Sequence, residues 1–198
     1  MPKYDFILAG VGGQGTILAS DILVEVGLKA GYDVKKSEVH GMSQRGGAVE
    51  SHVRWGRKVY SPVVEQGRVD YLLGFEMLEG ARWATYLNPR SKVYINTHKI
   101  YPPSVNIGQA RYPEAKNIEQ LLTGRAGFFE WVNATGKAME LGNQALAGVV
   151  VLGRLSRDLE VAVETWLEVI VDLVPAKFTE LNKQAFAAGR ELKEAFPA

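Results

Sequence analysis

The chain of 198 residues carries 23 basic and 22 acidic side chains, a net charge of +1, and no cysteine. This charge balance lacks the basic excess of a nucleic-acid-binding domain, and the hydrophobic (46%) and charged (23%) contents are those of a globular protein. Without thiolates the chain can ligate neither an iron–sulfur cluster nor a cysteine-bound zinc, and its three histidines have no metal-binding spacing.

Neither a signal peptide nor a membrane span is predicted. The N-terminal sequence "MPKYDFILAG" lacks a basic segment followed by a long apolar run. The longest apolar stretch, 145–153, is shorter than the roughly 18 residues that a span requires. We therefore expect one cytoplasmic domain over residues 1–198 that binds neither nucleic acid nor a membrane.

The first part of the chain predicts a strand, a glycine turn, a helix and a second strand. The apolar run Tyr4–Ala9 is typical of a buried strand. Apolar residues then recur at helical spacing over Ile17–Ala30, and Gly31 ends that helix. Asp33–Val39 is the second strand, so a right-handed parallel crossover is expected between the two strands.

The middle of the chain continues this alternation of strands and helices. In "AVESHVRWG" apolar and polar residues alternate, which predicts a strand whose wet face carries Glu50, His52 and Arg54. The strands "VDYLLGF" and "KVYIN" follow, separated by the helix "EMLEGARWATYL". The four tryptophans are spread widely and are expected in the core or at an interface.

Helices dominate the last third. After "YPPS" we expect a helix near 117–122, a strand in "GFFEWVNA" and a helix in "TGKAMELG". Three more helices are predicted over 145–155, 162–174 and 176–192, with Pro175 separating the last two. The predicted fold class is α/β: a doubly wound, mostly parallel Rossmann-like sheet with a helical C-terminal part.

The string "GVGGQGT" places Gly10, Gly12 and Gly15 in the spacing G-x-G-x-x-G between a strand and a helix. Such glycines permit a tight turn and a close approach of a ligand to the backbone, and the helix N-terminus can bind an anion. Glu38 ends the second strand near the position expected for a ribose-binding acid. The same turn can equally join a strand to a helix without any ligand.

A second string, "HGMSQRGG", follows the second strand, where an open α/β sheet has its ligand crevice. Arg45 is a forked donor suited to carboxylate or phosphate, and His40, Ser43 and Gln44 add neutral polar groups. Asn96, Thr97 and His98 end a later strand at the same edge. The alternative is that these are surface loops with incidental polarity.

Several strings together resemble one known family. "GVGGQGT", "SEVHGMSQRGGAVESHVRWG", "YSPVVEQGRVDYLLGFE" and "INTHKIYPP" resemble the beta subunit of indolepyruvate ferredoxin oxidoreductases, and "ATGKAMELGNQALAGVVVLGRL" and "ELNKQAFAAGRE" resemble its closing helices. This subunit corresponds to the gamma subunit or domain of the wider 2-oxoacid:ferredoxin oxidoreductases. The resemblance covers nearly the whole chain.

The resemblance implies a subunit that is inactive alone. The family, which belongs to anaerobic metabolism, decarboxylates a 2-oxoacid oxidatively on thiamine diphosphate, reduces ferredoxin and transfers the acyl group to coenzyme A. Thiamine diphosphate, Mg and [4Fe–4S] clusters are expected on a large alpha subunit, with coenzyme A as co-substrate and no cofactor held by this chain alone. The absence of cysteine agrees with that division, and the subfamily implies an aryl pyruvate as substrate.

The resemblance also implies a shared site at the subunit interface, with no catalytic acid or base assigned. Its candidate residues are Gly10, Gly12, Gly13, Gln14, Gly15, Thr16, Glu38, His40, Gly41, Ser43, Gln44, Arg45, Gly46, Gly47, Asn96 and Thr97. Two alternatives stay open. One is an autonomous NAD(P)- or flavin-dependent oxidoreductase that uses Gly10, Gly12, Gly15 and Glu38, and the other is a non-catalytic binding or scaffold module.

Overall fold

The sheet runs in the order β2-β3-β1-β4-β5-β6 in the computed structural model, which describes residues 1–40 and 47–193. Pairing is parallel from β1 to β6, and β3 is antiparallel to both β1 and β2, so the other strands all point one way. The predicted mostly parallel α/β fold is confirmed. The strands are β1 Tyr4–Val11, β2 Asp33–His40, β3 Ala48–Gly56, β4 Tyr71–Gly74, β5 Lys92–Asn96 and β6 Phe128–Val132.

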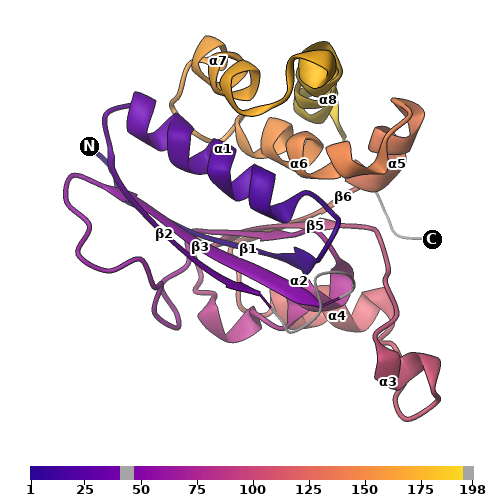
Figure 1. Cartoon of the computed structure of the whole chain (residues 1–198). Coiled ribbons are helices and arrows are strands. Elements are labelled where there is room, and N and C mark those ends of the chain that lie inside the picture. The colour runs from indigo at the N-terminus through magenta and orange to yellow at the C-terminus, as the bar shows by residue number, and fades with distance from the viewer. Residues whose placement is uncertain (41–46, 194–198) are drawn as a thin grey trace.

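Helices cover both faces of this sheet (Figure 1). On one face α1, α6, α7 and α8 enclose the larger core, and on the other α2 and α4 enclose a smaller one. The central strands β1, β4 and β5 are therefore buried on both faces, as a mostly parallel sheet requires. The helices are α1 Thr16–Lys29, α2 Met77–Ala81, α3 Pro103–Asn106, α4 Ala115–Thr123, α5 Ala134–Glu140, α6 Ala147–Leu155, α7 Val163–Leu173 and α8 Thr179–Glu191.

The order of the first three strands in the sheet differs from the expected order. β2 is parallel to β1, as expected, but it does not pair with β1. Instead β3 is inserted between them and bonds to β1 from Tyr4↔Trp55 to Val11↔Ala48 and to β2 along its other edge. β2 and β3 pair antiparallel from Asp33↔Gly56 to His40↔Val49, so β3 occupies the edge of β2 that would otherwise face β1.

The predicted wet face of β3 is wrong for His52, which is buried. Its Nδ1 accepts a hydrogen bond from the N–H of Val64 at 3.1 Å, and its ring packs edge-on against Trp83 at 5.2 Å. The segment 57–70 and the residues after α2 cover this part of the sheet. Burial lowers the pKa of His52, because the charged imidazolium loses its hydration.

Two helical segments also differ from expectation. The predicted helix 76–87 is split into α2 and a short 3₁₀ turn, Ala84–Tyr86. The short helix α3 begins at Pro103, the last residue of "YPP", where no helix was predicted, and none of its residues is buried. It projects from the body of the molecule (Figure 1).

The C-terminal helices contact one another through glycines. A Cβ at Gly153 of α6 would lie 2.2 Å from the carbonyl oxygen of Phe186, and one at Gly189 of α8 would lie 2.0 Å from that of Val150. The two helix backbones therefore touch. At its other side α6 is tied to the sheet, since Arg154 pairs with Glu130 of β6 with both groups buried.

Candidate functional site

The glycine turn lies at the carboxyl end of β1 and leads directly into α1. Gly13 and Gly15 have φ of 101° and 78°, a backbone conformation that L side chains rarely adopt. At Gly15 a Cβ would also lie 2.8 Å from the carbonyl oxygen of Ala145, just before α6. The third glycine thus allows close packing, as expected, although its neighbour is the segment before α6 rather than the sheet.

Gln14 is buried and holds the turn together. Its Oε1 accepts the N–H of Val11 at 2.8 Å, and its Nε2 donates to the carbonyl of Phe75, just after β4, at 2.8 Å. Both ends of the amide are engaged internally. The structure therefore gives Gln14, a candidate from the sequence, a supporting role beneath the turn.

Several N–H groups of the turn donate no hydrogen bond to the described residues. Within the described part of the chain, no acceptor meets the N–H of Gly13 or Gly15, and the first amides of α1 have none within the helix. The hydroxyl of Thr16 is buried without a hydrogen-bond partner. Gly12 is different, since its N–H donates to the carbonyl of Gly47 at 3.0 Å and joins the turn to the start of β3.

These groups border a hollow of about 110 Å³. Its walls are Val11, Gly12, Gly13, Gly15, Thr16, Ile17 and Val49. No acidic residue lies in the first turn of α1, and Gly15, the residue that caps α1, has no side chain to satisfy its amides. A helix N-terminus with free donors and an unsatisfied hydroxyl is suited to an anion of phosphate size.

Glu38 does not line this hollow. β3 separates its strand from β1, and its carboxylate pairs with Lys36 and accepts a hydrogen bond from the Ser20 hydroxyl at 3.2 Å. In a dinucleotide-binding domain the acidic strand is adjacent to the glycine turn. The arrangement here does not favour Glu38 as a ribose ligand.

Asn96 and Thr97 lie at the expected edge of the sheet, but their environments differ. Asn96 is fully buried, and its amide donates to the Phe75 carbonyl at 2.9 Å and to the Thr135 hydroxyl at 2.8 Å. The Asn96 side chain therefore fixes the ends of β4 and β5 to α5. Thr97 is partly exposed, with its hydroxyl 3.4 Å from Asn133 Oδ1, and His98 Nε2 lies 3.3 Å from the Gln144 amide.

Glu76 organises the same edge and was missed by the sequence analysis. Its buried carboxylate accepts the N–H of Glu79 at 2.8 Å, the N–H of Ile100 at 3.0 Å and the hydroxyl of Tyr112. Burial and this carboxylate raise the pKa of the Tyr112 hydroxyl. The available signal was an acidic residue directly after the buried strand "VDYLLGF".

The second predicted string is only partly described. Gly41, Ser43, Gln44, Arg45 and Gly46 lie outside the described residues, as does the side chain of His40. On either side of them the backbone of His40 pairs with Val49, and Gly47 bonds to Gly12. The Gly47 end of this segment is thus next to the glycine turn, and the His40 end is one strand further away.

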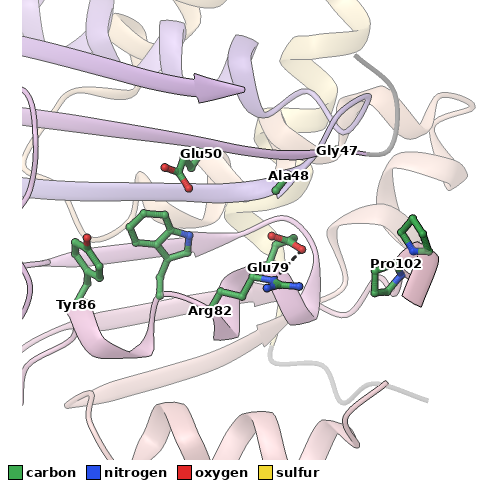
Figure 2. Close-up of a pocket in the computed structure, with 9 residues that line it drawn as sticks. Gly47, Ala48, Glu50, Glu79, Arg82, Tyr86 and Pro102 are labelled. Carbon is green, nitrogen blue, oxygen red and sulfur yellow. Dashed lines mark hydrogen bonds and ion pairs between the residues drawn. The ribbon is translucent and has the colours of Figure 1, made fainter. Parts of the chain in front are cut away.

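A larger pocket, of about 540 Å³, opens beside the turn on the α2 side of the sheet (Figure 2). Glu50 lies on the strand side, Glu79 and Arg82 lie on the helix side, and Tyr86 and Pro102 stand at opposite ends. Its full lining is Gly47, Ala48, Glu50, Glu79, Arg82, Trp83, Tyr86, Pro102 and Pro103.

Two classes of feature are absent from residues 1–40 and 47–193. No three His, Asp or Glu side chains cluster there as a metal site would require. No helix in that part has the length and apolarity needed to cross a membrane.

Comparison with known proteins assigns a family. Residues 5–192 match the model of the family described as pyruvate ferredoxin/flavodoxin oxidoreductase. The chain is similar to indolepyruvate oxidoreductase subunit IorB of Thermococcus kodakarensis and to that of Pyrococcus horikoshii, with 38% identity to each over 96% of this chain and 95% of the relative. The corresponding subunit of Archaeoglobus fulgidus is 36% identical over 94% of each chain.

Solved structures of low sequence identity share the fold. The gamma subunit of a keto/oxoacid ferredoxin oxidoreductase from Geobacter sulfurreducens has a TM-score of 0.66 at 24% identity, covering 95% of this chain and 96% of that one. Pyruvate oxidoreductase subunit PORC of Thermotoga maritima has a TM-score of 0.70 at 22% identity, covering 96% and 97%. A 2-oxoglutarate:ferredoxin oxidoreductase from Magnetococcus marinus, solved with 2-oxoglutarate, coenzyme A and succinyl-CoA bound, has a TM-score of 0.71 at 20% identity, and the match covers 32% of its chain.

Proposed function

The chain belongs to the pyruvate ferredoxin/flavodoxin oxidoreductase family as a subunit of an oxidoreductase complex, and from this premise we propose that it is the small subunit of an indolepyruvate:ferredoxin oxidoreductase. The observation that carries the proposal is the 38% identity to subunits of that name over 96% of the chain. No cysteine is present to bind a cluster, so the redox centres belong to another subunit.

The proposed reaction of the complex is the oxidative decarboxylation of a 2-oxoacid to its coenzyme A thioester. An aryl pyruvate loses its carboxylate as CO₂, and its acyl carbon is oxidised by two electrons and forms a thioester with the sulfur of coenzyme A. The two electrons reduce two ferredoxins, and the thiol proton is released. Thiamine diphosphate with Mg and [4Fe–4S] clusters, all on the large subunit, supplies the decarboxylation and electron transfer.

The small subunit contributes the anion-binding edge of the shared site. The open amides of Gly13, Gly15 and the first turn of α1, with the unsatisfied Thr16 hydroxyl, suit a phosphate group of coenzyme A. Gln14 and Asn96 hold this edge in place through Phe75. These residues bind and orient, and none of them is assigned a proton transfer.

Exposed apolar side chains border the same edge and are suited to a subunit interface. Ile17 is 42% exposed at the start of α1, Val39 is 54% exposed at the end of β2, and Tyr101 and Ile107 are 53% and 66% exposed around α3. Exposed apolar side chains beside a ligand hollow are suited to an interface between subunits.

Co-expression with a large subunit of the same family tests the proposal. We expect a stable complex that, assayed anaerobically, reduces ferredoxin with indolepyruvate in a coenzyme A-dependent manner. An assembled complex that turns over only other 2-oxoacids would contradict the substrate assignment, and failure of the two chains to associate would contradict the subunit role.

Arg45 tests the second string as part of the shared site. As the only cation in "HGMSQRGG", it is suited to a carboxylate or phosphate of a ligand. Arg45→Ala should lower kcat/KM by roughly ten- to a thousandfold, about 1.4 to 4 kcal/mol, in an intact complex. Arg45→Lys should restore part of the lost kcat/KM, since lysine keeps the positive charge but lacks the forked hydrogen-bond donors of the guanidinium. Unchanged kinetics in an assembled Arg45→Ala complex would exclude Arg45 from the site.

A further inference from the structure

Among the residues that the structure describes, one side chain on the α2 face of β3 lacks an internal partner. Glu50, His52 and Arg54 all project from this face, and two of them are engaged: His52 with the N–H of Val64 at 3.1 Å, and Arg54 with the Asp5 carboxylate at 2.8 Å. No hydrogen bond or ion pair to Glu50 is formed by the described residues. The hydrogen bonds and ion pairs among the described residues of this face therefore do not include Glu50.

The charge of the pocket around Glu50 is unbalanced. Glu79 pairs with Arg82 at 3.1 Å, so the lining contains two carboxylates and one guanidinium. Burial raises the pKa of the Glu50 carboxyl and also that of Glu79. A half-buried carboxylate without a counterion is costly in free energy, and a positive group entering from outside would remove that cost.

The aromatic wall suits the same kind of group. The rings of Trp83 and Tyr86 pack edge to face at 4.6 Å, and Trp83 also contacts His52, two residues along the strand from Glu50. Aromatic rings beside a carboxylate stabilise an ammonium or guanidinium group. An anion in the pocket would be repelled by the excess negative charge. An apolar group would bury Glu50 further without supplying a counterion.

We propose that this pocket accepts a lysine or arginine side chain of the large subunit, with Glu50 as its counterion and Trp83 and Tyr86 as its walls. The proposal rests on the proposed function, because the large subunit supplies the occupant. The position agrees with it: Gly47 lines the pocket and also bonds to Gly12 of the glycine turn. A basic anchor here would hold the partner beside the shared site.

The test compares Glu50→Gln and Glu50→Lys with a matched control, Glu160→Gln. Glu160 is exposed and lies near Tyr4, at the opposite end of β1. Dissociation constants of the small and large subunits are measured at low and high salt, with thermal unfolding of each small-subunit variant alone. We expect Glu50→Gln to weaken association about 10- to 100-fold and to reduce its salt dependence, and Glu50→Lys to weaken it further.

The unfolding data separate an interface role from a structural one. If Glu50 pairs only with the partner, Glu50→Gln leaves the melting temperature of the isolated chain unchanged or raises it. Association of Glu50→Gln equal to that of wild type and Glu160→Gln would overturn the proposal, as would a loss of stability in the isolated chain that accounts for weaker association. If wild-type chains do not associate at all, the proposed function itself fails.

Discussion

At Gly15 two independent constraints meet in one residue. Its φ of 78° disfavours any side chain, and its Cα faces the Ala145 carbonyl so closely that a Cβ would lie 2.8 Å from that oxygen. The adjacent Thr16 keeps an unsatisfied buried hydroxyl. The glycine at this position thus serves packing against the segment before α6, and the proposed anion-binding edge begins beside it.

Gly15→Ala and Gly67→Ala separate backbone strain from packing. Gly67 has a similar φ of 70°, but nothing lies within 4 Å of the position that a Cβ would occupy there. Gly67→Ala should cost about 1 kcal/mol of unfolding free energy, and Gly15→Ala should cost about 1–3 kcal/mol more because of the contact with Ala145. Urea unfolding of both variants checks this, and equal losses would contradict the packing role.

Among the elements, α6 is held by contacts on several sides. Its nine residues, Ala147–Leu155, are all buried, its backbone touches α8 at Gly153, and Arg154 pairs with Glu130 of β6 at 2.6 Å. The segment just before it contacts Gly15. A displacement of α6 would therefore disturb the packing of both the larger core and the glycine turn.

Gly153→Ala should destabilise the chain by about 1–3 kcal/mol. Alanine favours a helix over glycine by about 1 kcal/mol. However, the added Cβ would lie 2.2 Å from the Phe186 carbonyl oxygen. Because that oxygen belongs to the backbone of α8, the clash can be relieved only by moving the helix. Thermal unfolding should show a fall of about 2–4 °C per kcal/mol. Ala187→Ser, which adds one atom at an exposed position of α8, is the control and should stay within about 0.5 kcal/mol. A stabilised Gly153→Ala chain would disprove the close contact.

The molecule as a whole has the composition and surface of a subunit. It is a member of a family of oxidoreductases, yet it has no cysteine. The described residues of the glycine turn, with Asn96 and Thr97, lie at the carboxyl edge of the sheet, where exposed apolar side chains and the Glu50 pocket also lie. The chemistry of such a chain depends on what covers that edge.

We expect the chain purified alone to be colourless, to contain no iron and to oxidise no 2-oxoacid, because it lacks thiolates for a cluster. Iron analysis, visible absorbance and anaerobic assays of protein made without a partner provide the measurement. The reconstituted complex serves as the positive control. Absorbance of a cluster that persists in the isolated chain would contradict this prediction.

Much of the fold could be predicted because its signals are local. The period of apolar residues marks α1, β4 and β5, and the glycine turn between β1 and α1 can be read from six residues. The family could be recognised from strings such as "SEVHGMSQRGG", since a run of that length contains far more information than three spaced glycines.

Tertiary structure alone decided how these parts are combined. The insertion of β3 between β1 and β2 depends on pairing between strands distant in sequence, and it separates Glu38 from the glycine turn. Whether Gln14, Asn96 and His52 face a ligand, the interior or solvent depends on what packs over them, because burial is a property of neighbours and not of a residue's own type. The same reason applies to Glu50: only the folded chain shows that none of the other described residues pairs with it, whereas His52 and Arg54 on the same face have partners.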